Sequence, residues 1–421
     1  MIGLLFGCFA VLLVIGVPVA FSIGLTSFIV LLSQNVPMVV VAQRTFAGMD
    51  SFALVAVPCF ILAGDIMARG KISENLVNFA DSIFGFIKGG LWTVAILTSC
   101  LFAAMSGSAA ATTAAVGAPL IPKLKEKGYP TDTSAALIAA SGTIGIVIPP
   151  SVPMVVFAVI SGVPLSKLFI NGFIPGISMG LFLIGISMSI ARKMNLPTSQ
   201  AFSIKNIAKS FATAIWGLLV PGIILGGIFT GIFTPSEAAV IAVDYAVIVE
   251  LFVYRDLKVK EIGKMLVNTC ITMSTIMLLI GISNVFAWIF ANWRIADTIA
   301  AGILSLSDNR YVLMFFICLI ILFLGCFLET SAAIILVTPI FIPLLNALQV
   351  NLIHFGVLLV IGLAIGMTTP PVAICLYVAS SVAGIPFVQL SKKVIPFLLA
   401  LICVMLLYAY IPLLFPAMLL L

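Results

Sequence analysis

Hydroxyl residues, glycines and prolines interrupt two neighbouring apolar stretches of this chain. Ser106-Gly107-Ser108 breaks the first stretch, and Gly145-Ile146-Val147-Ile148-Pro149-Pro150 breaks the second. Proline removes a backbone donor and leaves carbonyl oxygens free, while glycine lets a backbone come close to a ligand. Free carbonyls and hydroxyls together offer an oxygen cage for a hard cation such as Na⁺. The helix N-termini at the same breaks have the opposite polarity, which suits a carboxylate.

The same pattern returns 221 residues later without a gap. Gly145 to Pro150 aligns with Gly366-Met367-Thr368-Thr369-Pro370-Pro371, and Ser106 to Ser108 aligns with Phe327-Leu328-Glu329, which Thr330-Ser331 follows. One proline kink would be an ordinary structural feature of a membrane helix. Two matched kinks, each after a matched break, indicate a duplicated unit, and paired interrupted segments of this kind point to a transport site.

These breaks predict where ions and substrate bind. We expect two sodium sites, one in each copy, because hydroxyls and carbonyls suffice for a monovalent ion whereas Ca²⁺ usually recruits carboxylates. The predicted sodium ligands are Ser106, Ser108, Gly145 and Pro149 in the first copy and Gly325, Thr330, Gly366 and Thr369 in the second. The predicted substrate contacts are Ser108, Thr112, Pro150, Ser151, Glu329 and Pro371.

Two acidic residues, Glu329 and Glu237, are interpreted in different ways. Glu329 lies in a deeply apolar run, where an ionisable residue is a candidate for function; the alternative is a neutral, capped carboxyl that holds the second hairpin tip. Thr234-Pro235-Ser236-Glu237 predicts a helix start, with Thr234 as N-cap, Pro235 in the first turn and Glu237 closing a capping box.

Three further residues are assigned structural roles from the sequence. Asp65 and Asp244 are interpreted as helix-packing or interfacial groups. His354 is the only histidine of the chain, and we expect it in an outer loop with a surface role. A metalloprotease HExxH helix, which needs two histidines, is therefore excluded.

Composition limits the class of protein. Hydrophobic residues make up 63% of the 421 residues and charged residues 8%, against about 25% charged in soluble domains. We therefore expect an all-α polytopic membrane protein with no soluble domain. Its net charge of +6 is relevant to topology and not to nucleic acid. The eight cysteines lie in apolar runs without CxxC spacing, and neither disulfides nor a metal cluster nor another cofactor is expected.

Basic residues predict the orientation. Of the 20 Lys and Arg, Arg44, Lys167, Arg294 and Arg310 fall on one side and the other sixteen on the opposite side. These sixteen are Arg69, Lys71, Lys88, Lys123, Lys125, Lys127, Arg192, Lys193, Lys205, Lys209, Arg255, Lys258, Lys260, Lys264, Lys392 and Lys393. By the positive-inside rule the larger set is cytoplasmic.

This orientation makes residues 89–122 a re-entrant hairpin, because basic residues precede and follow it on the same side. Its counterpart in the second copy is followed by the loop 344–354, which contains no Lys or Arg and is expected at the opposite face. The repeats are thus predicted to be inverted, with two re-entrant hairpins and two broken helices whose breaks meet near the membrane midplane.

Five units follow along the chain. We expect N-terminal scaffold helices in 1–88, the first transport repeat in 89–190, a connector and second scaffold part in 191–310, the second transport repeat in 311–390, and a C-terminal helix in 391–421. Residues 72–88 have the mixed pattern of an interfacial helix, and the polar segment 192–210 is interpreted as the connector. Residues 1–32 are either one kinked helix or two short ones.

Seven short motifs spread over the chain resemble the large membrane subunit of tripartite ATP-independent periplasmic (TRAP) transporters. They are VAQR (41–44), GMDSF (48–52), FILAGDIM (60–67), SGSA (106–109), IPPSVP (148–153), GIFTPSEAA (231–239) and TPP (369–371). The resemblance implies an elevator-type fold with a scaffold and a mobile transport domain in a bacterial inner membrane. It also implies a small four-helix membrane subunit and a periplasmic binding protein that delivers an organic acid such as a C4-dicarboxylate or sialic acid. Some relatives carry an acid at the position of Thr112, so the chain departs from the family there.

The function predicted from these features is sodium-coupled import of an organic acid, sialic acid or a similar carboxylate, by a protein that is not an enzyme. The alternative is a proton-coupled or stand-alone carboxylate carrier. A channel would need a continuous lining without duplicated dead-end hairpins, and an intramembrane enzyme lacks its histidines and metal ligands. We find no Arg within a hairpin that could clamp a second carboxylate, which favours a mono-acid.

The predicted topology can be tested by labelling. Cysteines introduced at Lys125 and Asn351 should react with impermeant maleimides from opposite faces, Lys125→Cys from the cytoplasm only. Reaction of both from one face would contradict the inverted repeats.

Overall fold

The chain is helical throughout the part that the structure describes. The computed structural model describes residues 2–304 and 309–414, so 305–308 and the residues 415–421 of the predicted C-terminal unit lie outside it. Within the described ranges, five helices are long and apolar enough to cross a membrane: Phe52–Arg69, Leu165–Lys193, Ile204–Phe229, Val259–Asn292 and Thr330–Ala347. Shorter apolar helices accompany them. The predicted all-α, multi-span architecture is confirmed.

The helices follow one another with short connections. The first ten α-helices are α1 (Ile2–Val14), α2 (Val19–Ser33), α3 (Val39–Met49), α4 (Ala56–Arg69), α5 (Lys71–Phe84), α6 (Gly90–Ser106), α7 (Ala109–Glu126), α8 (Thr131–Gly142), α9 (Val152–Ser161) and α10 (Leu165–Lys193). The others are α11 (Ile204–Phe229), α12 (Pro235–Ile248), α13 (Val259–Asn292), α14 (Ile295–Leu304), α15 (Arg310–Gly325), α16 (Thr330–Ala347), α17 (Leu352–Gly366), α18 (Ile374–Ala383), α19 (Phe387–Lys393) and α20 (Ile395–Leu414). Two 3-10 turns, η1 (Phe52–Val55) and η2 (Thr143–Ile146), and a π-helical turn, η3 (Val249–Val253), adjoin α4, α8 and α12.

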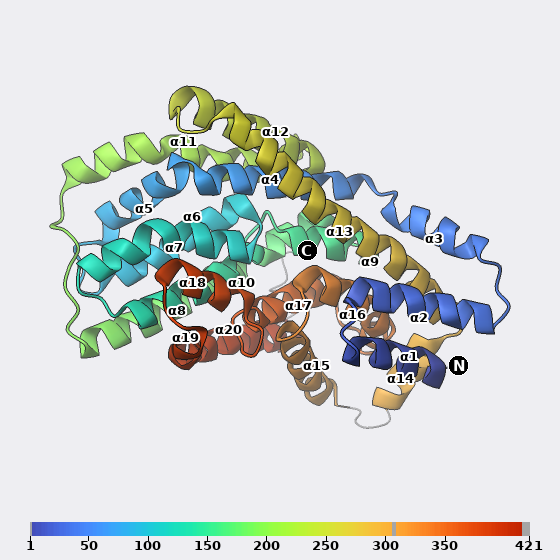
Figure 1. Cartoon of the computed structure of the whole chain (residues 1–421). Coiled ribbons are helices and arrows are strands. Elements are labelled where there is room, and N and C mark those ends of the chain that lie inside the picture. The colour runs from blue at the N-terminus through green and yellow to red at the C-terminus, as the bar shows by residue number, and fades with distance from the viewer. Residues whose placement is uncertain (1, 305–308, 415–421) are drawn as a thin grey trace.

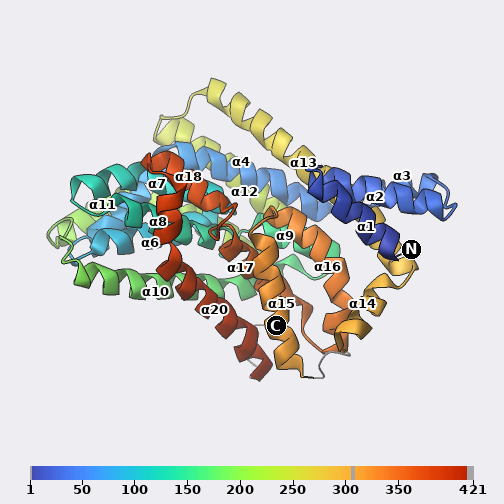
Figure 2. The ribbon, with the colours of Figure 1, turned by 60° about the horizontal axis from the view of Figure 1, so that its bottom comes forward.

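Two groups of helices are visible in Figure 1. The long helix α13 packs along α2 and α3 and crosses α4, while α12 packs against α4 and α11. A second group contains α6, α7, α8 and α18, and α10 joins it to α17 and α20. Figure 2 shows α13 with α1 to α3 on one side of the molecule and the cluster of α6, α7, α8 and α18 on the other. Helix α5 lies between them, against α11 and α6.

The duplicated unit is visible in the helices themselves. Helices α7 and α16 both have 18 residues and begin 221 residues apart, at Ala109 and Thr330. Helices α8 and α17 also begin 221 residues apart, at Thr131 and Leu352. The helix that follows the break in each copy packs against the other copy: α9 of the first packs against α16 of the second, and α18 of the second packs against α7 of the first. Such reciprocal contacts are those of two units related by a two-fold axis.

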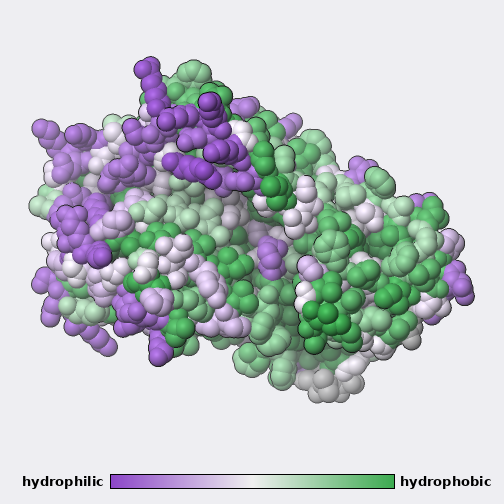
Figure 3. Space-filling view, in the orientation of Figure 1, coloured by the Kyte–Doolittle hydropathy of each residue, from purple (hydrophilic) through white to green (hydrophobic). Residues whose placement is uncertain are grey.

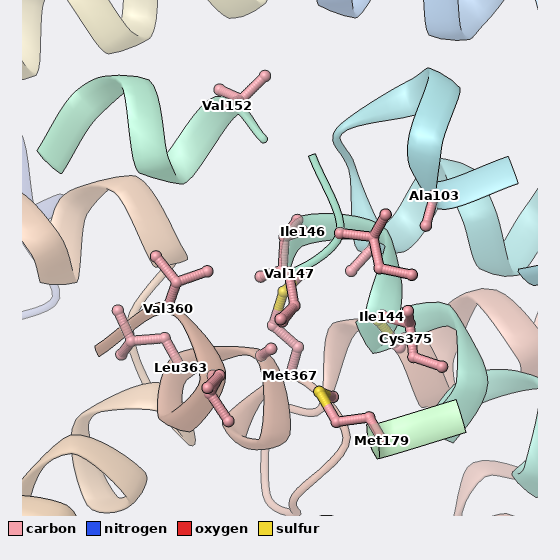
Figure 4. Close-up of a cluster of buried hydrophobic side chains, with 14 of the residues drawn as sticks. Ala103, Ile144, Ile146, Val147, Val152, Met179, Val360, Leu363, Met367 and Cys375 are labelled. Carbon is pink, nitrogen blue, oxygen red and sulfur yellow. The ribbon is translucent and has the colours of Figure 1, made fainter. Parts of the chain in front are cut away.

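Apolar side chains join the two broken helices at the centre of the molecule. Figure 4 shows Ile146 and Val147 from the first break beside Leu363 and Met367 from the second, with Met179 of α10 close by. Ile146, Val147 and Leu363 are almost completely buried. Each break contains one cis Pro-Pro bond, at Pro149-Pro150 and Pro370-Pro371.

Hydrophilic side chains gather at one end of the molecule. Figure 3 shows them on the left, where Figure 1 places the outer ends of α5, α7, α8 and α11. Much of the remaining surface in this view is hydrophobic, as expected for surface that faces lipid. The polar end carries many of the basic residues that the sequence assigns to the cytoplasm.

The helix boundaries and caps test three predictions about local structure. The capping box at Thr234 is confirmed, since its side chain accepts the Glu237 N–H and Glu237 accepts the Thr234 N–H. Of the predicted segment 1–32, the described residues from Ile2 onward form two helices, α1 and α2. The predicted connector 192–210 was too long, because α10 continues to Lys193 and α11 already begins at Ile204.

The predicted surface role of His354 was wrong. This residue lies in α17, is 1% exposed, and places Nε2 2.8 Å from the Tyr408 carbonyl oxygen. The loop before α17 is shorter than expected because Asn351 caps the helix, accepting the Ile353 N–H, so the histidine falls in the first turn.

Glu250 caps helix α5 from a distant part of the chain. It lies in the π-helical turn after α12, is fully buried, and accepts the Ile72 N–H at 3.2 Å through Oε1. Gly70, the residue before α5, packs so closely on this carboxyl that a Cβ there would overlap it. The start of α5 is therefore fixed to the end of α12.

This cap predicts a specific pattern of stability. Glu250→Ala should lower thermal stability in detergent by about 1–2 kcal/mol, the usual cost of losing an N-cap, whereas Glu250→Gln keeps an accepting oxygen and should lose less. Glu74→Ala in the same helix is the control, because Glu74 is exposed. Equal melting temperatures for all three variants would exclude this role for Glu250.

Candidate functional site

A cavity of about 360 Å³ lies where the turns of the two helix pairs, α6–α7 and α15–α16, meet α4 and α13. Its lining comprises Ser106, Gly107, Ser108, Ala109, Ala110 and Ala111 from the first turn, Glu329, Thr330 and Ser331 from the second, Ile61, Gly64 and Asp65 from α4, Thr272 and Ile276 from α13, and Ile146, Val152, Pro153 and Met367 from the breaks. We call it the tip cavity. The sequence prediction that both turns form one site is consistent with this arrangement.

Three helix N-termini converge on the tip cavity. Ala109 to Ala111 are the first turn of α7, Thr330 and Ser331 begin α16, and Val152 and Pro153 begin α9. A helix N-terminus carries a partial positive charge and unpaired N–H groups. An anionic group in this cavity would therefore be attracted from three directions.

The caps of α7 and α16 occupy equivalent positions of the two copies but differ in charge. Ser108 Oγ accepts the Ala111 N–H at 3.4 Å, and Glu329 Oε2 accepts the Ala332 N–H at 3.0 Å. The two residues are 221 positions apart. Ser331 Oγ also donates to Glu329 Oε1 at 3.2 Å. Glu329 is thus a capping carboxylate that also lines the cavity, which unites the two readings from the sequence.

The first copy contains a cluster of hydroxyls behind its turn. Thr112 Oγ1 donates to the Ser108 carbonyl at 2.8 Å and lies 2.9 Å from Ser106 Oγ. Gly145 faces the same cluster, since a Cβ there would lie 2.7 Å from the Ser108 oxygen. Three of the four residues predicted for the first sodium site are thus together, with Thr112 added. Pro149, the fourth, is buried, but no polar contact connects it to the cluster.

In the second copy, two backbones touch where the first copy has hydroxyls. A Cβ on Gly366 would overlap the backbone of Gly325, so α15 and α17 can meet there only as glycines. Thr330 Oγ1 lies 3.3 Å from the sulfur of Met367. Thr369, which follows α17, donates through Oγ1 to the Ile365 carbonyl of that helix at 2.9 Å, and its side chain also bonds that of Cys326, next to Gly325. The four residues predicted for the second sodium site therefore lie in one region, but the Thr369 hydroxyl proton is used by a backbone carbonyl.

The structure places some of the predicted substrate contacts at the tip cavity and others away from it. Ser108 and Glu329 line the tip cavity, and Thr112 belongs to the hydroxyl cluster. Pro150 lies behind the turn, near Gly107. Ser151 is fully buried, donates to the Ile146 carbonyl at 2.6 Å and caps α9. Pro371 is exposed and does not line this cavity.

Asp65 is a cavity residue that the sequence reasoning assigned to packing. It lies in α4 and lines the tip cavity together with Ser106 and Glu329. Its neighbour Gly64 lets α4 approach closely, since a Cβ there would lie 3.0 Å from the Ser106 oxygen. The sequence does contain a signal for this role, because Asp65 is an ionisable residue in an apolar run, as Glu329 is.

The charged groups of the tip cavity are both acidic. Asp65 and Glu329 line it, and its lining contains no Lys or Arg. Within the described residues, no group of three or more His, Cys, Asp or Glu is placed to hold a metal ion. The cavity therefore offers hydroxyls, backbone dipoles and two carboxylates as its polar groups.

Comparisons with known proteins agree on one family. Three similar proteins are the sialic acid TRAP transporter large permease protein SiaM of Vibrio cholerae (38% identical, covering 98% of this chain and 96% of that protein), the C4-dicarboxylate TRAP transporter large permease protein DctM of Pseudomonas aeruginosa (37%, 88% and 87%), and the isethionate TRAP transporter permease protein DctMQ of Oleidesulfovibrio alaskensis (38%, 97% and 65%). The chain thus spans 65% of the length of the isethionate protein.

Solved structures with the same fold are more distant in sequence. The YdaH transporter of Alcanivorax borkumensis matches with a TM-score of 0.67 at 14% identity, over 90% of this chain and 88% of that one. MtrF of Neisseria gonorrhoeae matches with a TM-score of 0.62 at 14% identity, over 88% and 84%. The family described as the tripartite ATP-independent periplasmic transporter, DctM component, matches residues 6–414. The chain therefore belongs to the DctM family of TRAP transporter large permeases, multi-pass proteins of the bacterial inner membrane.

Proposed function

We propose that this chain is the large membrane subunit of a sodium-coupled secondary transporter that imports an organic acid by an elevator mechanism. The observation that carries the proposal is the tip cavity, in which three helix N-termini converge on a space with two acidic and no basic side chains. The N-termini attract a carboxylate. Asp65 and Glu329 repel it unless a cation is bound nearby. Substrate binding and cation binding are coupled for that reason.

Sodium ions are the cations that the available ligands suit. In the first copy, the Ser106 and Thr112 hydroxyls and the Ser108 carbonyl lie within hydrogen-bond distance of one another. A hard monovalent cation can lie between these oxygens and be held by their lone pairs, with the hydroxyl protons turned outward. In the second copy, the site lies around Thr330 and the close contact of Gly325 with Gly366, with carbonyl oxygens as ligands.

The moving part would be the interlocked pair of repeats. The reciprocal contacts of α9 with α16 and of α18 with α7 support inverted repeats, each with a re-entrant hairpin and a broken helix. We assign residues 89–190 and 311–390 to the transport domain and residues 1–88 and 191–310 to the scaffold. Helix α5 then connects the scaffold to the first hairpin.

The tip cavity lies toward the cytoplasmic end of the scaffold in this structure. Asp65, which lines it, is four positions before Arg69, the last residue of α4 and one of the predicted cytoplasmic basic residues. Four residues of helix span only about 6 Å. The described conformation corresponds to a transport domain on the cytoplasmic side.

Partners and substrate class follow from the family. We propose a small membrane subunit and a periplasmic binding protein that delivers the substrate. The three relatives named above are associated with sialic acid, C4-dicarboxylates and isethionate at 37–38% identity, so overall similarity favours none of these substrates. Without a basic residue in the tip cavity, a single acidic group on the substrate is favoured over two.

Proton coupling is the second candidate. Asp65 and Glu329 face one cavity, and protonation of either would remove the repulsion that a sodium ion offsets in the first proposal. The two candidates differ in which ion gradient drives uptake.

Reconstitution should separate them. Proteoliposomes containing the large and small subunits with the binding protein should accumulate substrate under an inward Na⁺ gradient at equal pH. Omitting the binding protein or the small subunit should reduce uptake to the protein-free level, because the described residues 2–304 and 309–414 include no soluble domain that could capture dilute substrate. Accumulation driven by a pH gradient without Na⁺ would establish the second candidate, and conduction at channel rates would contradict both.

A matched pair of variants tests the first sodium site. Thr112→Val keeps the shape of the side chain and removes one oxygen, and we expect about tenfold more Na⁺ for half-maximal uptake, the equivalent of losing ~1.5 kcal/mol of a charged contact. Thr113→Val removes a hydroxyl that bonds the Ala109 carbonyl of its own helix at 2.9 Å and should leave the Na⁺ response unchanged. An unchanged response of Thr112→Val would locate the ion elsewhere.

A further inference from the structure

A second cavity of about 360 Å³ lies on the same side of α13 as the tip cavity, farther from the cytoplasmic end. The scaffold lines it with four polar residues, Asp50, Ser51, Ser283 and Asn284, and with Ala47, Gly48, Ile280 and Ala287. Helices α9 and α16 line it with apolar residues such as Ile160 and Ile342. We call it the upper cavity. No hairpin turn reaches it in this structure.

One face of α13 runs from the tip cavity to the upper cavity. Thr272 and Ile276 line the first, and Ile280, Ser283 and Ala287 line the second. Their spacing of three or four residues places them on a single stripe of the helix. Thr272 and Ser283 are eleven positions apart, which is close to three turns, or a rise of about 16 Å.

On helix α16, the residues that line the two cavities have the same separation along the sequence. Ser331 lines the tip cavity and Ile342 the upper cavity, and they are also eleven positions apart. Helices α13 and α16 are in contact. A shift of α16 by about 16 Å along α13 would place Ser331 where Ile342 now lies, opposite Ser283.

The upper cavity already has the polar groups that such a shift requires. Ser283 is 6% exposed, and its hydroxyl has no hydrogen-bond partner. A polar group that enters the upper cavity can therefore hydrogen-bond this hydroxyl. Asp50 lines the upper cavity and Asp65 lines the tip cavity, so the scaffold contributes one carboxylate to each.

We propose that the upper cavity is the place that the substrate site occupies when it opens to the periplasm. Ser283 and Asn284 then form the scaffold wall in place of Thr272 and Ile276, and they hydrogen-bond oxygen atoms of the bound organic acid. The transport domain travels three turns of α13. This inference rests on the proposed elevator mechanism and adds its register and its outward-facing contacts.

Pairs of cysteines test the register in membranes that contain the complete transport system, with the eight native cysteines replaced. Mercuric ion bridges two thiols that come together and protects both from later labelling by maleimide. Ser331→Cys should be protected with Thr272→Cys and also with Ser283→Cys. It should not be protected with Leu278→Cys, because Leu278 is 40% exposed and lies off the stripe.

A second variant tests the cavity itself. Ser283→Phe should fill the upper cavity and abolish uptake, while the Thr272–Ser331 pair built into it is still protected, which shows that the protein is folded. Leu278→Phe should retain uptake. The cysteine-free parent protein should first show normal Na⁺-driven uptake. If Ser331→Cys is then protected with Thr272→Cys but not with Ser283→Cys, the inference is overturned and the proposed function still stands. A parent without Na⁺-driven uptake would refute the proposed function instead.

Discussion

Helix ends inside an apolar molecule need partners for their backbone groups, and this requirement governs the centre of the structure. An unpaired N–H or C=O costs several kcal/mol in a membrane. The chain places the starts of α7, α9 and α16 at its core and caps them with Ser108, Ser151 and Glu329. The cavity is the space that these capped ends enclose. Its polarity is therefore a by-product of the same groups that keep the breaks stable.

The contacts between the copies make the breaks behave as a unit. Within the second copy, Gly325 and Gly366 meet backbone to backbone, and between the copies α9 packs against α16 and α18 against α7. A displacement of one hairpin relative to its broken helix would separate these surfaces and expose groups that only protein satisfies. Movement of the whole assembly against α4 and α13 leaves them intact. Packing thus favours rigid-body motion over opening of a single hairpin.

The sequence predicted those parts of the site that depend on local pattern. The repeat of 221 residues located both turns and both breaks, and Thr234 to Glu237 predicted a capping box that the structure contains. Side-chain direction was beyond it: Ser151 turns to a backbone carbonyl, while Pro371 is exposed although Pro150 is buried. Asp65 was assigned to packing because its cavity partners lie at least 41 positions away in sequence, and only tertiary packing brings them together.

The apolar contact between α13 and α16 affects the rate of the motion that we propose. In the described ranges, no hydrogen bond or ion pair joins α13 to α16, and the facing surfaces include Ile280, Ile335 and Pro339. Directional bonds broken in a low-dielectric interior would add a barrier at every register, whereas dispersion contacts are weak individually and re-form continuously. In the motion that we propose, sliding along this interface would therefore meet a low barrier between the two end positions. The polar groups at either end would stabilise these two positions, and the apolar groups between them would keep the barrier low.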